Sequence, residues 1–135
     1  MDKINFSTDQ FSHWMEAICS LSEEQFSRKM HLYLGEIKTP YNKQRLAEQL
    51  AGFLRKSENI QNLISFLDEF DLQILTAVSL FPRATETLWI DFFSTQYSQS
   101  DIYAELLNLE DRLLIYKSKD KFSSTEFIFI NPLLK

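Results

Sequence analysis

DEFDLQILTAVSLFPRATETLWIDFFSTQYSQSDIYAELLNLEDRLLIYKSKDKFSSTEFIFI, residues 68–130, is the stretch that decides the fold. Its opening segment, 68–81, has apolar side chains at helical spacing and leaves few positions for water. Asp68 and Glu69 place carboxylates where they complement the partial positive charge of a helix N-terminus, and Pro82 ends the segment. We therefore expect a helix that is covered on more than one side.

Two further helices are predicted after Pro82. Thr85 can cap the first of them and Ser98 the second. The first contains two adjacent apolar pairs one turn apart, namely Leu88, Trp89, Phe92 and Phe93. The second has a continuous apolar stripe made by Ile102, Leu106, Leu109 and Leu113. We expect both the aromatic cluster and the stripe to lie in the core.

The spacing of apolar residues along the chain changes after this third helix. Residues 114–116 and 127–130 are short apolar runs on either side of a polar turn, which predicts a β-hairpin. The order helix, helix, helix, hairpin resembles the winged-helix variant of the helix-turn-helix, and the resemblance covers about half of the chain. The hairpin would then be the wing.

The first half of the chain is predicted to be helical throughout. Helix starts are indicated at Ser7, Ser22, Thr39-Pro40 or Asn42, and Ser57, and Gly35 is placed to end the second helix. No linker separates this half from the segment at Asp68. We expect a mainly α fold with a small β-hairpin, in which an N-terminal helical bundle, 1–67, packs on a winged-helix unit, 68–135, and shares one core with it.

Composition narrows the class of protein. The chain has 135 residues, 44% of them hydrophobic, and a formal net charge of −5, so any nucleic-acid surface must be a local patch. A lone cysteine, Cys19, rules out an internal disulfide and favours a reducing compartment. No apolar run approaches the roughly 20 residues that span a bilayer, and the N-terminus has no signal-peptide pattern. We expect a soluble, cytoplasmic protein that does not bind membranes.

Catalytic and metal-binding patterns are weak in this sequence. His13, His31 and Cys19 lack a second ligand at the spacing that metal sites use. The pairs Glu23-Glu24 and Asp68-Glu69 both fall in the first turn of a predicted helix, where complementing the helix dipole explains them. There is neither a glycine-rich phosphate loop nor a Gly-x-Ser-x-Gly elbow. We expect no enzyme activity, no cofactor, no metal and no small-molecule substrate.

Charge is distributed unevenly along the chain. Residues 28–67 sum to +4 and 116–135 to +2, whereas 68–115 sum to −7. The candidate phosphate contacts are therefore the basic residues of the third helix and of the wing turn, namely Lys43, Arg45, Arg55, Lys56, Lys117, Lys119 and Lys121. A charged turn is also an ordinary way to keep a hairpin soluble, so a merely solvated surface is the alternative.

A different surface is expected on the third helix of the winged unit. Its stripe away from the core is formed by Asp101, Glu105, Asn108 and Arg112. Carboxylates there would repel phosphates if this helix entered a major groove. The stripe is therefore a candidate face for a protein partner.

Two segments carry a second resemblance. Residues 66–75, FLDEFDLQIL, and 109–116, LEDRLLIY, are similar to the helical-plus-winged-helix accessory modules beside helicase domains of the XPB type. This resemblance implies a non-catalytic interaction or regulatory module, accessory to nucleic-acid machinery, with sequence-independent phosphate contacts. The alternative is a protein–protein interaction domain that uses its acidic winged-helix face and binds no nucleic acid.

Overall fold

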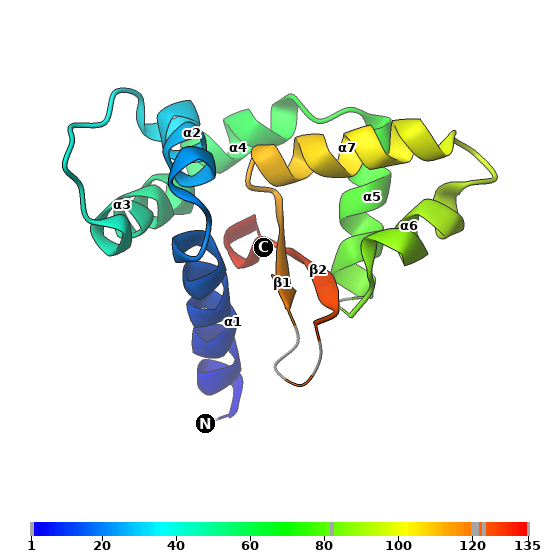
Figure 1. The fold of residues 1–135 in the computed structure, drawn as a ribbon, viewed down its shortest axis with the longest axis horizontal. Helices are drawn as coiled ribbons and strands as arrows, with labels where there is room; N and C mark the ends of the chain where they lie inside the picture. The colour runs from blue at the N-terminus through cyan, green and yellow to red at the C-terminus, as the bar shows by residue number, and fades with distance from the viewer. Residues whose placement is uncertain (1, 82, 120–121, 123, 135) are drawn as a thin grey trace. The chain divides into compact units, whose positions relative to one another are not determined.

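The computed structural model describes residues 2–81, 83–119, 122 and 124–134, with side chains from residue 10 onward. The chain is mainly helical, with one two-stranded antiparallel sheet (Figure 1). In chain order its elements are α1 (Asp2–Cys19), α2 (Glu23–Leu34), α3 (Lys43–Arg55), α4 (Ser57–Ser65), α5 (Glu69–Leu80), α6 (Glu86–Phe93), α7 (Gln99–Asp111), β1 (Ile115–Lys119), β2 (Glu126–Ile130) and the 3-10 turn η1 (Pro132–Leu134).

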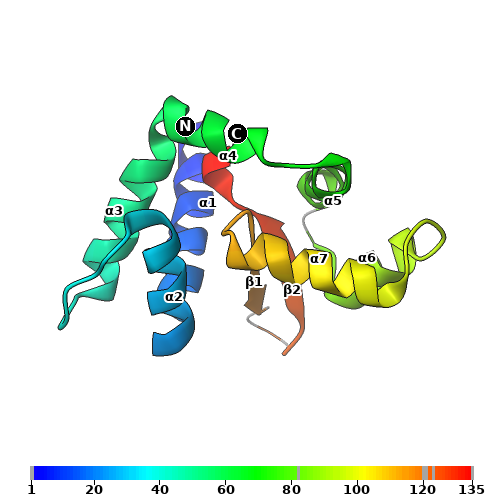
Figure 2. The same cartoon turned by 90° about the horizontal axis from the view of Figure 1, so that it is seen from above.

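The chain divides into two compact units. The first comprises Met1–Phe66 together with Pro132–Lys135, and the second comprises Leu67–Asn131. The chain thus leaves the first unit after α4 and returns to it at η1, which packs against α1 and α3 (Figure 2). The sequence-based prediction placed residues 132–135 in the winged-helix unit, 68–135. A core shared by the two units stays a prediction.

The core of the first unit is built from one face of each of its first three helices. Fully or nearly fully buried side chains are Trp14, Met15, Ile18, Phe26, Met30, Ala47, Leu50, Ala51 and Leu54. These positions recur at three- and four-residue intervals, as the burial of one helical face requires. The first unit therefore has a core to which each of these three helices contributes one apolar face.

Local capping chemistry sets most of the helix ends in this unit. Ser22 Oγ accepts the Gln25 N–H (3.3 Å) and Asn42 Oδ1 accepts the Arg45 N–H (3.0 Å), as predicted. Gly35 ends α2 with a φ of 75°, the left-handed region that glycine adopts without strain.

Two predicted helix starts are wrong. The first helix begins at Asp2 rather than Ser7, because a serine with a glutamine three residues later also fits the interior of a helix. The cap of α4 is Lys56 rather than Ser57, which is the first residue of the helix itself.

The second unit combines α5, α6 and α7 with the hairpin. In the sheet Ile115 pairs with Ile130 and Lys119 with Glu126, and Ala84 forms a single antiparallel bridge to Ile128. Its core contains Ile74, Leu75, Val78, Trp89, Phe93, Ile102, Leu106, Leu109, Leu113, Leu114, Ile115 and Ile128. The apolar stripe predicted on α7 is buried along its whole length, which confirms that prediction.

The aromatic cluster predicted on α6 is only half correct. Trp89 and Phe93 are buried, whereas Leu88 and Phe92 are 49% and 60% exposed. On a helix the two pairs are about 100° apart, so packing that covers one pair leaves the other facing water. Similarly, α5 buries Ile74, and its Leu72 remains half-exposed.

The turn from α7 into β1 requires an unusual backbone conformation. Leu113 has a φ of 63°, in the left-handed region, and Leu114 N–H donates to Leu109 O (2.9 Å) to close the helix end. Glycine is the usual residue at such a position. The buried Asn131 holds the turn instead, because its Nδ2 donates to Leu113 O (2.8 Å).

Candidate interaction surfaces

Lys43, a predicted phosphate contact, has partners inside the first unit. Its Nζ donates to Leu21 O (2.7 Å) and to Cys19 O (3.5 Å), and it lies 3.5 Å from the Glu23 carboxylate. Because α1 ends at Cys19, this ammonium satisfies carbonyls that the helix end leaves without intrahelical donors. Its charge thus holds the α1–α2 turn, and a phosphate contact by Lys43 stays a prediction.

A basic surface remains on α3. Arg45 and Gln49 are exposed one turn apart on α3, and Lys56, the residue that follows the helix, is exposed as well. Arg55, also exposed, lies with its guanidinium 4.5 Å from the centre of the Phe11 ring, which is a cation–π contact. We call Arg45, Gln49 and Lys56 the α3 face.

The wing lysines differ from one another. Lys117 Nζ lies 2.7 Å from Glu86 Oε2 and 3.6 Å from Glu110 Oε2. Burial lowers the pKa of Lys117, but the hydrogen bond to Glu86 and the charge of Glu110 outweigh this effect and leave that pKa raised. Lys117 is thus an internal ion-pair partner, and its role as a phosphate contact stays a prediction. Lys119 is exposed, and Lys121 lies outside the described residues.

The stripe predicted as a protein-binding face on α7 is divided by the structure. Asp101 and Asn108 are exposed, as expected. Arg112 Nη1, however, lies 3.5 Å from the carboxylate of Asp71, which is buried at the start of α5. Glu105 Oε1 is buried as well and has no hydrogen-bond partner among the described residues. Glu105 and Arg112 are therefore partly buried, and their contact with a partner stays a prediction.

Asp71 and Glu105 form a carboxyl pair with opposite protonation preferences. Burial raises the pKa of Glu105 to about 8, and the nearby Asp71 contributes to this. Burial also acts to raise the pKa of Asp71, but hydrogen bonds from Glu105 and the Asp68 backbone, with the charge of Arg112, lower it. The Asp68 N–H donates to Asp71 Oδ2 (3.0 Å), and the Asp71 N–H donates to Asp68 Oδ1 (2.7 Å). Asp71 thus forms, with Asp68, the capping box that begins α5, and Glu105 belongs to α7.

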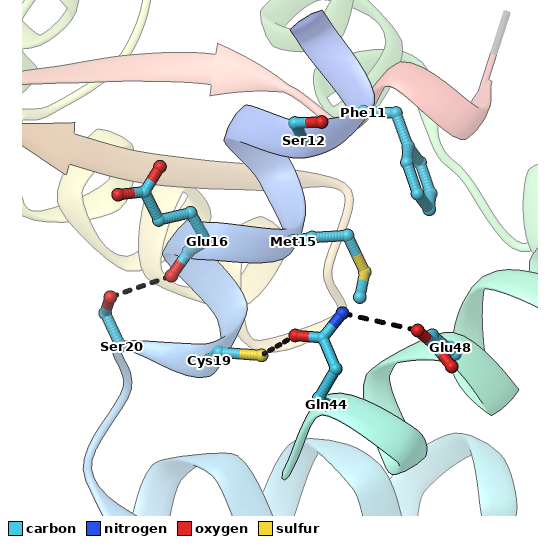
Figure 3. Close-up of a pocket in the computed structure, with 8 residues that line it drawn as sticks. All are labelled: Phe11, Ser12, Met15, Glu16, Cys19, Ser20, Gln44 and Glu48. Carbon is cyan, nitrogen blue, oxygen red and sulfur yellow. Dashed lines mark hydrogen bonds between the residues drawn. The ribbon is translucent and has the colours of Figure 1, made fainter. Parts of the chain in front are cut away.

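A hollow of about 450 Å³ lies on the first unit between α1 and α3 (Figure 3). Its lining residues are Phe11, Ser12, Met15, Glu16, Cys19, Ser20, Gln44 and Glu48. Cys19 Sγ donates to Gln44 Oε1 (3.7 Å), and Gln44 Nε2 donates to Glu48 Oε1 (3.3 Å). Burial raises the pKa of the Cys19 thiol, which keeps it protonated and weakly nucleophilic at neutral pH.

The described residues contain neither a cluster of metal ligands nor a membrane-spanning helix. Within the part of the chain that the structure describes, no three His, Cys, Asp or Glu residues gather as metal ligands would. None of the described helices has the length and apolar character needed to cross a bilayer.

The largest departure from the sequence predictions is an apolar surface on the second unit. Phe81 is 58% exposed, and its ring centre lies 6.2 Å from that of Trp89, which is 1% exposed. Phe92 lies 5.8 Å from the same indole. Leu88 is one turn before Phe92 on α6 and is also exposed. We call Phe81, Leu88 and Phe92 the aromatic patch. Their helical spacing favoured burial, so the sequence carried no signal for it.

Comparison with known proteins gives one match. A family model described as an N-terminal domain matches residues 1–55, which covers α1, α2 and α3 but less than half of the chain. No curated protein and no solved structure matches the chain. The match concerns the unit that contains Lys43 and the hollow, and it does not extend to the unit that bears the aromatic patch.

Proposed function

We propose that this chain is a non-catalytic interaction module that docks a protein partner through the aromatic patch. The observation that carries the proposal is the exposure of Phe81, Leu88 and Phe92 around a buried indole. Single exposed apolar residues are ordinary on protein surfaces, but a contiguous group that includes two phenyl rings is typical of a binding surface. Aromatic side chains are also enriched at the centres of protein interfaces.

We further propose that Leu67–Asn131 is a winged-helix unit. Support comes from the order α5, α6, α7, β1, β2 and from the bridge that Ala84 makes to Ile128, which adds a short third pairing to the hairpin. On this proposal α7 takes the place of a recognition helix. Asp101 is exposed on α7, and a carboxylate there repels phosphates. The unit then serves protein contacts in preference to reading DNA.

A second candidate function keeps the link to nucleic-acid machinery. The α3 face presents Arg45 and Lys56 to solvent, although the exposed Glu48 lies one turn after Arg45. Such cations contact phosphates irrespective of base sequence. With Lys43 and Lys117 held by internal partners, few cations remain for this role. We therefore rank it below protein docking.

Photo-crosslinking in cells that naturally make the protein tests the docking proposal. A benzophenone side chain is placed at Phe92 in the full chain and, as a matched control, at Leu32 of α2, whose exposed fraction of 59% is similar. The proposal expects discrete protein adducts from position 92 and none from position 32. Absence of adducts from positions 81, 88 and 92 alike would overturn it.

Duplex DNA tests the second candidate. Arg45→Glu with Lys56→Glu should weaken salt-dependent binding, whereas Asp101→Ala should not. Lack of any binding by the wild-type chain at low salt would exclude this candidate.

A further inference from the structure

Resting on the proposed docking role, we propose that the aromatic patch receives a basic amphipathic helix from the partner protein. The first observation concerns charge. By sequence, α5, α6 and α7 together contain eight Asp or Glu residues and no Lys or Arg. A partner segment that approaches these helices is therefore selected for positive charge, because opposite potentials favour encounter and like charges oppose it.

The cations elsewhere in the second unit offset part of this charge, but Asp91 on α6 and Asp101 on α7 remain exposed. Lys117 is paired with Glu86 and Glu110, and Arg112 lies beside Asp71. Arg83 lies with its guanidinium 5.0 Å from the centre of the Phe127 ring. These positive groups thus already contact side chains of their own unit.

One exposed carboxylate also lies next to the patch. Asp91 is exposed on α6, three residues after Leu88, so its carboxylate lies beside Leu88 on the helix surface. An occupant that covers Leu88 and Phe92 brings its own flanking residues to this carboxylate. Lys or Arg at such a flank gains an ion pair, whereas Asp or Glu is repelled.

The backbone at the patch favours a helical occupant. An extended peptide binds by adding to a free sheet edge, where main-chain donors and acceptors are available. The side of α6 offers neither, because its backbone groups are engaged within the helix. An α-helix satisfies its own backbone and presents apolar side chains at three- and four-residue intervals, which match the one-turn spacing of Leu88 and Phe92.

A second copy of this chain fits the patch poorly. Two copies would bring two carboxylate-rich surfaces together, and each chain carries a net charge of −5. Like charges brought face to face oppose association. The same charge argument that selects a basic partner therefore disfavours self-association.

Two designed peptides provide the test. One is a fluorescein-labelled helix of about 16 residues made of Leu and Lys, and the other has the same Leu positions with Glu in place of Lys; neither contains Trp. Binding to the full chain is measured by fluorescence anisotropy at low and moderate salt. We expect the Leu–Lys peptide to bind and the Leu–Glu peptide to bind at least about tenfold more weakly.

Single substitutions in the chain show where the Leu–Lys peptide binds. Phe92→Ser should weaken binding of the Leu–Lys peptide by about tenfold or more, which is the effect of losing one central side chain of an interface. Leu32→Ser, at a similarly exposed position of the first unit, should leave affinity unchanged, and Asp91→Asn should reduce both affinity and salt dependence. Circular dichroism verifies that each variant retains its helices.

The outcomes separate the two proposals. Equal affinity for both peptides, or unchanged binding by Phe92→Ser, would overturn the basic-helix inference. So would sedimentation showing a dimer that Phe92→Ser dissociates, because the occupant would then be a second copy. If adducts form at position 92 in cells while the Leu–Lys peptide fails to bind, docking stands and the partner class is wrong. If both fail, the proposed function fails with it.

Discussion

Replacing Lys43 with methionine separates a structural role for this side chain from a ligand-binding one. Methionine keeps most of the aliphatic stem and removes the charge, its hydrogen bonds and the cation–π contact of Nζ with the Phe26 ring, whose centre lies 5.3 Å away. The carbonyls of Leu21 and Cys19 then lose a charged donor. Hydrogen bonds to charged groups contribute about 1.5–3 kcal/mol each, and the longer 3.5 Å contact contributes less than the 2.7 Å one.

The expected loss in free energy of unfolding is about 2–3 kcal/mol, the contribution of one strong charged hydrogen bond with a weaker second. The ion pair with Glu23 adds little, because that carboxylate is 75% exposed and salt screens it. Urea unfolding followed by Trp14 fluorescence measures the loss. Trp14 is buried in α1, so a Trp89→Phe background makes the signal specific to the first unit.

Arg45→Met is the matched control, since Arg45 is exposed two residues further along α3. An exposed position away from such contacts should change stability by no more than about 0.5 kcal/mol. If Lys43→Met also stays within about 0.5 kcal/mol, the clamp on the α1–α2 turn is refuted. Lys43 would then again be a candidate phosphate contact.

Three further changes test the second unit by urea unfolding. With the pKa of Glu105 raised from 4.5 to about 8 in the folded chain, stability should fall as pH rises through this window, because only the unfolded chain releases the proton there. Glu105→Gln should reduce this dependence of stability on pH, and the variant should be more stable than the wild type at pH 8. An unchanged dependence on pH would contradict a buried, protonated Glu105 carboxyl. Asn131→Ala should cost about 1–3 kcal/mol by leaving Leu113 O without its buried donor, and a neutral result would mean that water replaces it. Trp89→Ala should cost about 3–5 kcal/mol and Leu88→Ala much less, so equal losses would contradict their different burial.

Features that depend on neighbours in the chain were predictable from the sequence. A helix cap joins a side chain to the backbone three residues later, so Ser22, Asn42 and Ser98 could be identified without knowledge of the fold. The apolar stripe from Ile102 to Leu113 was predictable for the same reason, because a single helix fixes its spacing.

Features that depend on packing between elements were not predictable. The spacing of Leu88 with Phe92 equals that of Trp89 with Phe93, and only tertiary contacts decide which pair is buried. Asp71 and Glu105 are 34 positions apart, and sequence alone does not reveal that two carboxyls meet. One local signal was missed: Asp68 and Asp71 have the spacing of a capping box, although the usual second residue is Glu or Gln.

Charge summed along the sequence overestimated the surface available to nucleic acid. Of the predicted contacts, Lys43 and Lys117 have internal partners, Arg55 stacks on Phe11, and Lys121 lies outside the described residues. Arg45, Lys56 and Lys119 remain exposed, which at about 0.9 per phosphate gives a salt slope of only about 2–3.

Such a slope predicts a loss of only about 20–60-fold in affinity between 50 and 200 mM salt, against 10³–10⁵ for proteins with six to ten phosphate contacts. A phosphate-binding surface this small can assist nucleic-acid binding but does not explain a dedicated DNA-binding domain. The aromatic patch, in contrast, leaves 49–60% of each of its three residues exposed. Apolar area exposed without a partner is the larger physical anomaly, and for that reason protein docking ranks above phosphate binding.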